Sequence, residues 1–257
     1  MRLGLYGCGR LNKIVVDCYK NGLLEGYEIV GCYSKTKEHR ESMANDLGID
    51  ACDSYEELIN KDLDYIIEAT NPLATKDVLE KTLCKGINVV LLSIGALADE
   101  DYYEHIKKIC IKHNVKIHLA SGAICGFQVL RTAGLMNMTK ASLTNTKGPK
   151  ALKKTTLYQE NFETEEATVF DGTAYDAILN LPTGINVGVA TALATMGVYN
   201  TGVKILSKPG FIGDSQCIDI ECGDEIKAHL DVYSKTSDIA GYSVVALLQN
   251  LVNPIVF

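Results

Sequence analysis

Two glycines near the start of the chain have the type and spacing of a phosphate-binding turn. The turn, residues 7–9, follows a short apolar run, and a helix can begin directly after it. The first glycine allows a tight turn, the second lets the backbone approach a pyrophosphate, and the first N–H groups of the helix add donors and a favourable dipole. The third glycine of the G-x-G-x-x-G pattern is replaced by Asn12, so a plain strand-to-helix turn is the alternative. The predicted cofactor contacts are Gly7, Gly9, Arg10 and Leu11.

The stretch after the second predicted strand bears on the identity of the nucleotide. Residues 27–33 form an apolar strand about 20 residues after the turn, as a βαβ unit requires. NAD sites usually place Asp or Glu at the end of this strand, whereas NADP sites place small polar and basic residues there. No carboxylate occurs here before Glu38. We therefore expect NADP, with NAD possible, and a phosphate cradle of Ser34, Lys35 and Thr36, although a solvated turn would have a similar sequence.

Apolar strands alternate with helical segments through about residue 120, which predicts a Rossmann-type doubly wound parallel sheet of an α/β protein. Six strands are expected, including a short one at residues 49–52. Ligands bind such sheets at the carboxyl ends of the strands, so the loops there contain candidate contacts. For the cofactor these are Asn71, Pro72, Ser93 and Ala123, and for the substrate they are Ser121 and Gly122.

The pattern changes at residue 121 to β runs mixed with helices, which predicts a smaller α+β domain with an antiparallel sheet. The β runs are residues 140–147, 155–158, 204–206, 215–222 and 225–233. The last two are expected to pair as a hairpin. The helix at 239–251 is apolar on nearly all sides and must be buried. We expect domains at 1–120 and 121–238, with segment 239–257 packing back on the first domain or in a dimer interface.

Composition narrows the class of protein. The 257 residues carry a net charge of −7 with no basic cluster, which argues against nucleic acid as a partner. No apolar run approaches the ~20 residues of a membrane span and no signal peptide precedes the first strand, so a cytoplasmic protein is expected. The nine cysteines are scattered, and Cys217 and Cys222 have no histidine at the spacing of a zinc site. Reduced thiols and no metal site are therefore expected.

Several segments resemble, in the same order, those of the L-aspartate dehydrogenase family. The central one, residues 121–126, reads Ser-Gly-Ala-Ile-Cys-Gly and is similar to the family's Ser-Gly-Ala-Ile-Gly-Gly. The others are residues 7–11, 148–152, 170–174, 181–182 with 185–187, and 235–237. The resemblance implies a Rossmann domain plus an α+β domain, a homodimer, and nicotinamide-dependent oxidation of an amino acid to an imine. It also implies substrate contacts at Asn186, Lys235 and Thr236.

The chain departs from the family at the catalytic position. The family's histidine corresponds to Gln216, its Asp to Lys208, and its frequent Arg-Asn to Thr183-Gly184. Hydride leaves the α-carbon only when the amine is unprotonated, and losing the base that deprotonates it typically costs ~10²- to 10⁴-fold in rate. Glutamine exchanges no proton at physiological pH, but it can orient an imine, an amide or a water by hydrogen bonds.

Two residues near Gln216 are considered as substitutes for the base. Asp214 lies two residues earlier, on the same strand face, and His229 lies on the paired strand. Gln216 and Asp214 are taken as the catalytic candidates. Three functions stay open: a dehydrogenase of the aspartate type, an imine reductase or a dehydrogenase for a different amino acid, and a non-catalytic nucleotide-binding member of the family.

Overall fold

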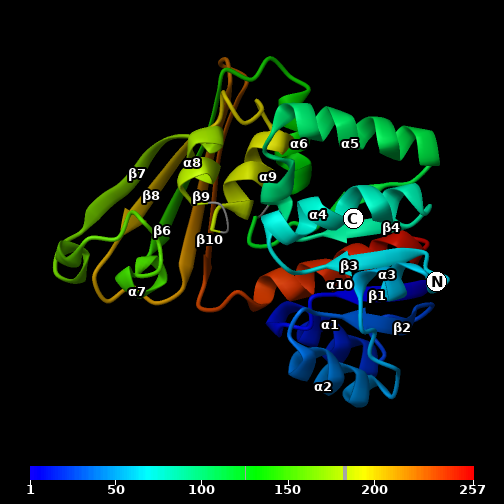
Figure 1. Ribbon diagram of the computed structural model, residues 1–257. Coiled ribbons are helices and arrows are strands. Elements are labelled where there is room, and N and C mark those ends of the chain that lie inside the picture. Colours follow the sequence, from blue (N-terminus) through cyan, green and yellow to red (C-terminus); the bar gives the residue numbers. More distant parts are fainter. Residues whose placement is uncertain (125, 182–183) are drawn as a thin grey trace. The chain divides into compact units, whose positions relative to one another are not determined.

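The computed structural model of the protein describes residues 1–124, 126–181 and 184–257. The chain divides into two compact units (Figure 1). The first unit contains residues 1–96, 100–122 and 238–257, and the second contains residues 97–99 and 123–237. The C-terminal segment therefore belongs to the same unit as the N-terminal one.

The first unit is built on sheet A, a parallel sheet of five strands in the order β2-β1-β3-β4-β5. The strands are β1 (Arg2–Tyr6), β2 (Glu28–Tyr33), β3 (Tyr65–Glu68), β4 (Asn88–Leu91) and β5 (Ile117–Leu119). The helices are α1 (Arg10–Lys20), α2 (Lys37–Leu47), α3 (Tyr55–Ile59), α4 (Pro72–Cys84), α5 (Glu100–His113) and α10 (Asp238–Val252). A short 3-10 turn, η1, spans Ile94–Leu97. The predicted doubly wound sheet is confirmed.

Successive side chains of each strand of sheet A point to opposite faces, and both faces are covered. On one face, Leu3 and Leu5 pack in an apolar cluster with Val15 of α1 and Val244 of α10. On the other face, Tyr6 and Ile66 pack in a second cluster with α3 and α4 residues, among them Leu58 and Ala74. Burial on both faces is the reason that these strands read as continuous apolar runs.

Helix α10 packs closely against α1. A Cβ built on Gly241 of α10 would lie 2.9 Å from Cβ of Ile14, so only glycine permits this approach. The Tyr27 hydroxyl donates to the Leu248 carbonyl oxygen at 2.7 Å. The apolar sequence of α10 thus serves burial on the first unit.

One predicted strand of the first unit does not form. Residues 49–52 make a single bridge, Cys32 to Ala51, at the edge of β2. The segment is therefore an extended connection between α2 and α3, and sheet A has five strands where the sequence predicted six. Gly48, which ends α2 with a φ of +69°, has the left-handed conformation expected of a helix C-cap.

The second unit is built on sheet B, which has the strand order β10-β9-β6-β8-β7. Its strands are β6 (Lys140–Lys147), β7 (Ala167–Thr173), β8 (Gly202–Ser207), β9 (Asp214–Cys222) and β10 (Ile226–Ser234). Its helices are α6 (Phe127–Gly134), α7 (Pro149–Leu152), α8 (Ala174–Asn180) and α9 (Asn186–Ala194), with a 3-10 turn η2 (Glu160–Glu163). The α+β domain is confirmed, and its sheet is mixed, because β6 and β8 are parallel while the other pairs are antiparallel.

The hairpin predicted at the end of the second unit is confirmed. Strands β9 and β10 pair antiparallel from Cys222 opposite Ile226 to Asp214 opposite Ser234. The strand predicted at residues 155–158 is wrong: the segment forms turns, and the fifth strand of sheet B is β7.

None of the helices in the described ranges could cross a lipid bilayer.

Candidate functional site

The glycine turn after β1 has the geometry that a phosphate contact needs. Gly7 has a φ of +96°, and a Cβ there would lie 2.5 Å from the Ala69 carbonyl oxygen, so no other residue fits. Gly9 is the N-cap residue of α1, and a Cβ there would meet no described atom within 4 Å. The turn therefore leaves open space at the position where a phosphate would approach the helix.

Asn12 explains how the turn is held without a third glycine. Its side chain is fully buried, and its Nδ2 donates to the Gly7 carbonyl oxygen at 2.7 Å and to that of Tyr6 at 3.3 Å. The amide thus ties the first turn of α1 to the end of β1. A small third residue is unnecessary because this side chain fills the space with hydrogen bonds.

The N-terminus of α1 has a charge distribution that suits an anion. The first turn contains no acidic residue, and no described side chain caps it. Arg10 stands at the first helical position, where its Nε lies 2.8 Å from Asp238 Oδ1. The unpaired N–H groups of a helix start attract phosphate oxygens. The residues present therefore fit the pyrophosphate of a dinucleotide.

The connection from β2 to α2 contains the predicted phosphate cradle, and the first turn of α2 contains Arg40, a residue that the sequence reasoning missed. Thr36 precedes α2, and its side chain makes no capping hydrogen bond with the described residues. Arg40, whose side chain is 12% exposed, donates from Nη1 to the Ser34 carbonyl oxygen at 3.3 Å and lies with Nη2 2.9 Å from Asp53. A guanidinium near this strand end is typical of sites that accommodate a 2′-phosphate.

Two of the predicted loop contacts have structural partners within the first unit. Asn71 caps α4, accepting at Oδ1 from the N–H groups of Leu73 and Ala74 at 3.1 Å, and Pro72 is the first residue of that helix. Ser93 is buried and donates from Oγ and from its N–H to the carboxylate of Glu68, both at 2.9 Å.

Glu68 is a buried carboxylate at the carboxyl end of β3 that the sequence reasoning did not select. It also accepts from the N–H and hydroxyl of Thr70, both at 2.6 Å. These hydrogen bonds fix the loops after β3 and β4 relative to each other. A charged residue at a core position of an apolar strand was the signal that could have identified it.

The Ser121-Gly122-Ala123 turn lies at the boundary of the two units. The Gly122 N–H donates to the Ser243 hydroxyl of α10 at 3.0 Å, so this N–H already has a partner. Ser121 and Gly122 belong to the first unit, and Ala123 belongs to the second. Cys125 and Thr183, which the sequence reasoning also considered, lie outside the described residues.

Cys8, the middle residue of the glycine turn, is buried in the core of the first unit. Its hydrogen bond with Cys32 and its burial raise the pKa of the Cys8 thiol well above the ordinary value. The thiol is therefore neutral and unreactive at physiological pH.

In the second unit, polar residues gather at one end of the face of sheet B that helices α6 and α9 cover. This inner face is apolar over most of its extent: Leu143, Ile218 and Val203 are all buried. At one end of the face, where the strand pairing places residues of β6, β8 and β9 in adjacent rows, the side chains become polar. We call this set the polar end: Asn145, Lys147, Ser207, Asp214 and Gln216.

The polar end contains an ion pair and two unpartnered oxygens. Lys147 Nζ lies 2.6 Å from Asp214 Oδ1, and the Lys147 side chain is only 18% exposed. Gln216 is 4% exposed and Ser207 is 1% exposed, yet Gln216 Oε1 and Ser207 Oγ have no hydrogen-bond partner in the part of the chain that the structure describes. Buried polar atoms without partners are rare, and each calls for an explanation such as a ligand or water.

The predicted substrate residues of the second unit lie partly near the polar end. Lys235 and Thr236 follow directly on β10, whose last residue, Ser234, pairs with Asp214. Asn186 begins α9, which packs on the inner face: a Cβ on Gly188 of that helix would lie 3.2 Å from Val203.

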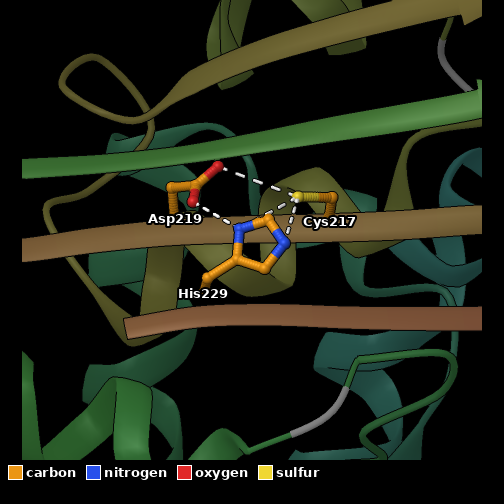
Figure 2. Close-up of side chains that lie close together, drawn as sticks. All are labelled: Cys217, Asp219 and His229. Atoms are coloured by element: carbon orange, nitrogen blue, oxygen red, sulfur yellow. Dashed lines mark hydrogen bonds and ion pairs between the residues drawn. The ribbon is translucent and has the colours of Figure 1, made fainter. Parts of the chain in front are cut away.

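His229 faces away from Gln216. It pairs in register with Asp219, and residues 217 and 219 occupy the opposite, outer face of sheet B. There Cys217, Asp219 and His229 form the cluster drawn in Figure 2. A hydrogen bond to Asp219 raises the pKa of His229, and burial, Asp219 and Asp231 raise the pKa of Cys217. His229 is therefore not positioned to act as a base beside Gln216.

Asn145, Lys147 and Ser207 are the site residues that sequence reasoning missed. In β6, apolar residues alternate at 141 and 143 and are then replaced by Asn145 and Lys147 on the same face. In β8, Ser207 follows Val203 and Ile205 in the same way. A change from apolar to polar within one strand face was the signal available in the sequence.

Comparisons with known proteins cover the whole chain. Residues 7–120 match the family model of the homoserine dehydrogenase NAD-binding domain, and residues 128–251 match that of the aspartate dehydrogenase C-terminal domain. An L-aspartate dehydrogenase from Methanococcus maripaludis is 32% identical over 273 residues, covering 99% of this chain and 98% of that protein. One from Methanospirillum hungatei is 30% identical over 264 residues, covering 100% and 98%.

A solved structure is similar in fold. The crystal structure of aspartate dehydrogenase from Thermotoga maritima superimposes with a TM-score of 0.81 at 22% identity, covering 100% of this chain and 99% of that one. The two chains thus share one fold over nearly their full lengths.

Proposed function

Because the chain belongs to the L-aspartate dehydrogenase family, we propose that it oxidises the CH–NH2 group of an amino acid with a nicotinamide cofactor. The observation that carries the proposal is the polar end of sheet B, where a half-buried cation lies beside buried oxygens without partners. An amino acid offers the complementary groups, a carboxylate for the cation and amine hydrogens for the oxygens.

Two residues of the polar end, Lys147 and Gln216, contact the substrate in this proposal. Lys147 exchanges part of its ion pair with Asp214 for the α-carboxylate of the substrate. The Gln216 Oε1 atom accepts a hydrogen bond from the amine and so directs the nitrogen lone pair. When bound, the nicotinamide supplies the hydride acceptor. Since glutamine takes up no proton, the substrate must react as the free amine formed in solution.

Gln216 also favours a second candidate within the same enzyme class. Reduction of an imine, or oxidation of an amino acid other than aspartate, makes less demand on a histidine base at this position. The absence of a titratable group at residue 216 therefore supports an imine reductase or a dehydrogenase for a different amino acid as the alternative. A nucleotide-binding protein without turnover is the remaining outcome.

For the cofactor we propose NADP in preference to NAD. The loop after β2 provides hydroxyl groups and a cation, from Ser34, Lys35 and Thr36. The Arg40 guanidinium donates to the Ser34 carbonyl oxygen of this loop, and its Nε is unpartnered among the described residues. These groups suit a 2′-phosphate better than a pair of ribose hydroxyls. Dissociation constants for the two cofactors test this directly, and tighter binding of NAD would refute it.

The function is tested with a panel of amino acids, and of 2-oxo acids with ammonia, each with both cofactors, followed by the absorbance of the reduced nicotinamide. Turnover that depends on one amino acid or its oxo acid supports the proposal. Nucleotide binding without turnover on any member of the panel would identify the chain as a non-catalytic relative.

The variant Gln216→His tests the catalytic position. If residue 216 contacts the substrate amine, histidine supplies a base, and the rate of aspartate oxidation rises by ~10²-fold or more. The variant also gains a pH inflection near ~6.5, the ordinary pKa of histidine. An unchanged rate and pH profile would show that residue 216 is not at the catalytic position.

A homodimer and a cytoplasmic location stay predictions.

A further inference from the structure

The outer face of sheet B contains a cluster of metal-ligating side chains that the proposed function does not use. Cys217 and Asp219 of β9 and His229 of β10 project from the same face and converge (Figure 2). One possible ligand atom from each lies within 4.8 Å of the others. The sequence predicted no metal site because no histidine follows the cysteines at a zinc-like spacing, but here the histidine comes from the neighbouring strand.

The distances between these atoms are close to those of a tetrahedral ion. With Zn–S near 2.3 Å and Zn–N and Zn–O near 2.1 Å, a tetrahedron separates sulfur from nitrogen or oxygen by about 3.6 Å. The Cys217 sulfur lies 3.6 Å from His229 Nδ1, 3.7 Å from Nε2 and 3.7 Å from Asp219 Oδ2. Two of the three edges of the coordination triangle are thus already at their required length.

His229 and Asp219 are joined by a hydrogen bond through Oδ1, the carboxylate oxygen that does not face the Cys217 sulfur. His229 Nδ1 lies 2.7 Å from Asp219 Oδ1, whereas a tetrahedral ion separates nitrogen and oxygen by about 3.4 Å. Breaking this hydrogen bond needs a small rotation of the imidazole and loss of the shared proton. The His229 side chain is 64% exposed and that of Asp219 is 42% exposed, so both can move without disturbing the core.

The donor set selects a class of metal. Thiolate and imidazole are ligands of Zn²⁺ and other late transition ions, whereas Mg²⁺ and Ca²⁺ require oxygen ligands. A second carboxylate, that of Asp231, stands opposite Cys217 on the same face and adds negative charge. Asp231 is held by the Ser215 hydroxyl, which donates to Oδ1 at 3.0 Å, so Asp231 is a neighbour of the site and the three convergent groups are the ligands.

We propose that Cys217, Asp219 and His229 form a surface site for a Zn²⁺-class divalent ion, with a water molecule as the fourth ligand. On binding, the Cys217 thiol loses its proton to solvent and ligates as thiolate, and no oxidation or reduction takes place. The ion joins β9 to β10 across the hairpin. Since Gln216 lies on the opposite face of the same strand, the ion would also stiffen the strand that presents it.

The test uses the full chain, freed of metal with a chelator and titrated with Zn²⁺ and separately with Co²⁺. The expected result is one ion bound per chain and a thiolate-to-cobalt charge-transfer band in the near-ultraviolet spectrum. Zn²⁺ is also expected to raise the melting temperature, because an ion that binds only the folded state stabilises it. Absence of stoichiometric binding, or a Co²⁺ spectrum without the thiolate band, overturns the proposal.

Variants assign the ligands. Cys217→Ser is expected to abolish the charge-transfer band, and His229→Gln and Asp219→Asn are each expected to weaken Zn²⁺ binding at least ~10-fold, since even outer-shell changes cost that much. Cys84→Ser and His105→Gln are the matched controls. Cys84 is an exposed thiol on α4, and His105 Nε2 lies 3.0 Å from Glu80 in an exposed pair with no cysteine.

The controls make the result decisive. If the Cys84→Ser and His105→Gln variants bind Zn²⁺ as the unaltered chain does while the three ligand variants do not, the site is on the outer face of sheet B. If Cys217→Ser retains full affinity, or a control loses it, the bound ion is elsewhere and the proposal fails. Far-ultraviolet circular dichroism of the metal-free variants confirms that each is folded.

Discussion

Gln216 and Cys217 are neighbours in β9, yet their side chains lie in opposite environments. Gln216 is buried on the inner face of sheet B, and its Oε1 has no partner within the described ranges. Cys217 lies on the outer face, within hydrogen-bonding distance of both Asp219 and His229. The alternation of side chains along a strand therefore separates two polar groups that are adjacent in sequence.

The two faces differ in the burial and the hydrogen-bond partners of their polar residues, and this difference indicates what each set can bind. A buried oxygen without a partner destabilises the folded chain by about 1–3 kcal/mol, so the polar end suits a ligand or a water molecule that supplies the missing hydrogen bonds. On the outer face, the polar groups hydrogen-bond to one another and remain open to solvent, so they destabilise little. The inner face therefore suits the proposed amino-acid substrate, and the outer face suits the proposed cation.

The largest effect is expected from Lys147→Met, which removes the cation of the inner face and keeps its apolar stem. Hydrogen bonds to charged groups contribute about 1.5–3 kcal/mol, so kcat/KM for the amino-acid substrate should fall about 10- to 100-fold. Lys140→Met, on the same strand but paired with Glu221 on the outer side, should leave kcat/KM unchanged. Equal losses of kcat/KM in both variants would show that the two faces do not differ in their contribution to the reaction.

Next in size is the effect of Gln216→Met, which removes the amide with its unpartnered oxygen but keeps the length of the side chain. We expect kcat/KM to fall about 10-fold while the free energy of unfolding rises by about 1 kcal/mol, because a buried unsatisfied oxygen is lost. Urea denaturation and steady-state kinetics measure the two quantities. A variant that is less stable and equally active would show that Gln216 serves packing and not the substrate.

A smaller gain in stability is expected from Ser207→Ala. Its hydroxyl is buried beside Lys147 in the strand register and lacks a described partner, so the free energy of unfolding should rise by up to about 1 kcal/mol. Ser142→Ala, on the outer side of β6, should change stability less than this. A loss of stability in the Ser207 variant would mean that an internal water satisfies the hydroxyl in the free protein.

The smallest effect is expected from His229→Gln measured in the presence of a chelator. His229 and Asp219 form an exposed pair, and such pairs contribute little to stability. The melting temperature should change only slightly, and kcat/KM should not change. A large loss of activity in metal-free buffer would connect the outer face to the reaction and so contradict the separation proposed here.

Much of the first unit could be predicted from the sequence because its signals are local. The apolar strands, the positive φ of Gly7 and the C-cap at Gly48 each follow from a few adjacent residues. The prediction of a strand at 49–52 was wrong. Whether this segment becomes a strand depends on how many of its residues pair with β2, and the local sequence does not contain that information. The role of Asn12 was missed for a similar reason, since its partners are the carbonyl groups of Tyr6 at the end of β1 and of Gly7 in the turn.

The candidate site of the second unit could be predicted only in part. Strand periodicity placed Asp214 and Gln216 on one face, as the structure has them. Lys147 and Ser207 reach the same end of that face through the pairing of β6 with β8 and β9. Strands distant in sequence acquire a register from hydrogen bonds and side-chain packing across the whole sheet.

The glycine turn and the order of the strands and helices of the first unit, apart from residues 49–52, follow from the sequence alone. These depend on residue type and short-range spacing. Only the tertiary structure decided that β6 and β8 run parallel, that five polar residues share one end of sheet B, and that His229 meets Cys217 and Asp219. Which strands contact each other depends on the burial and hydrogen bonding of the whole unit. The spacing of residues along one strand therefore does not predict these contacts.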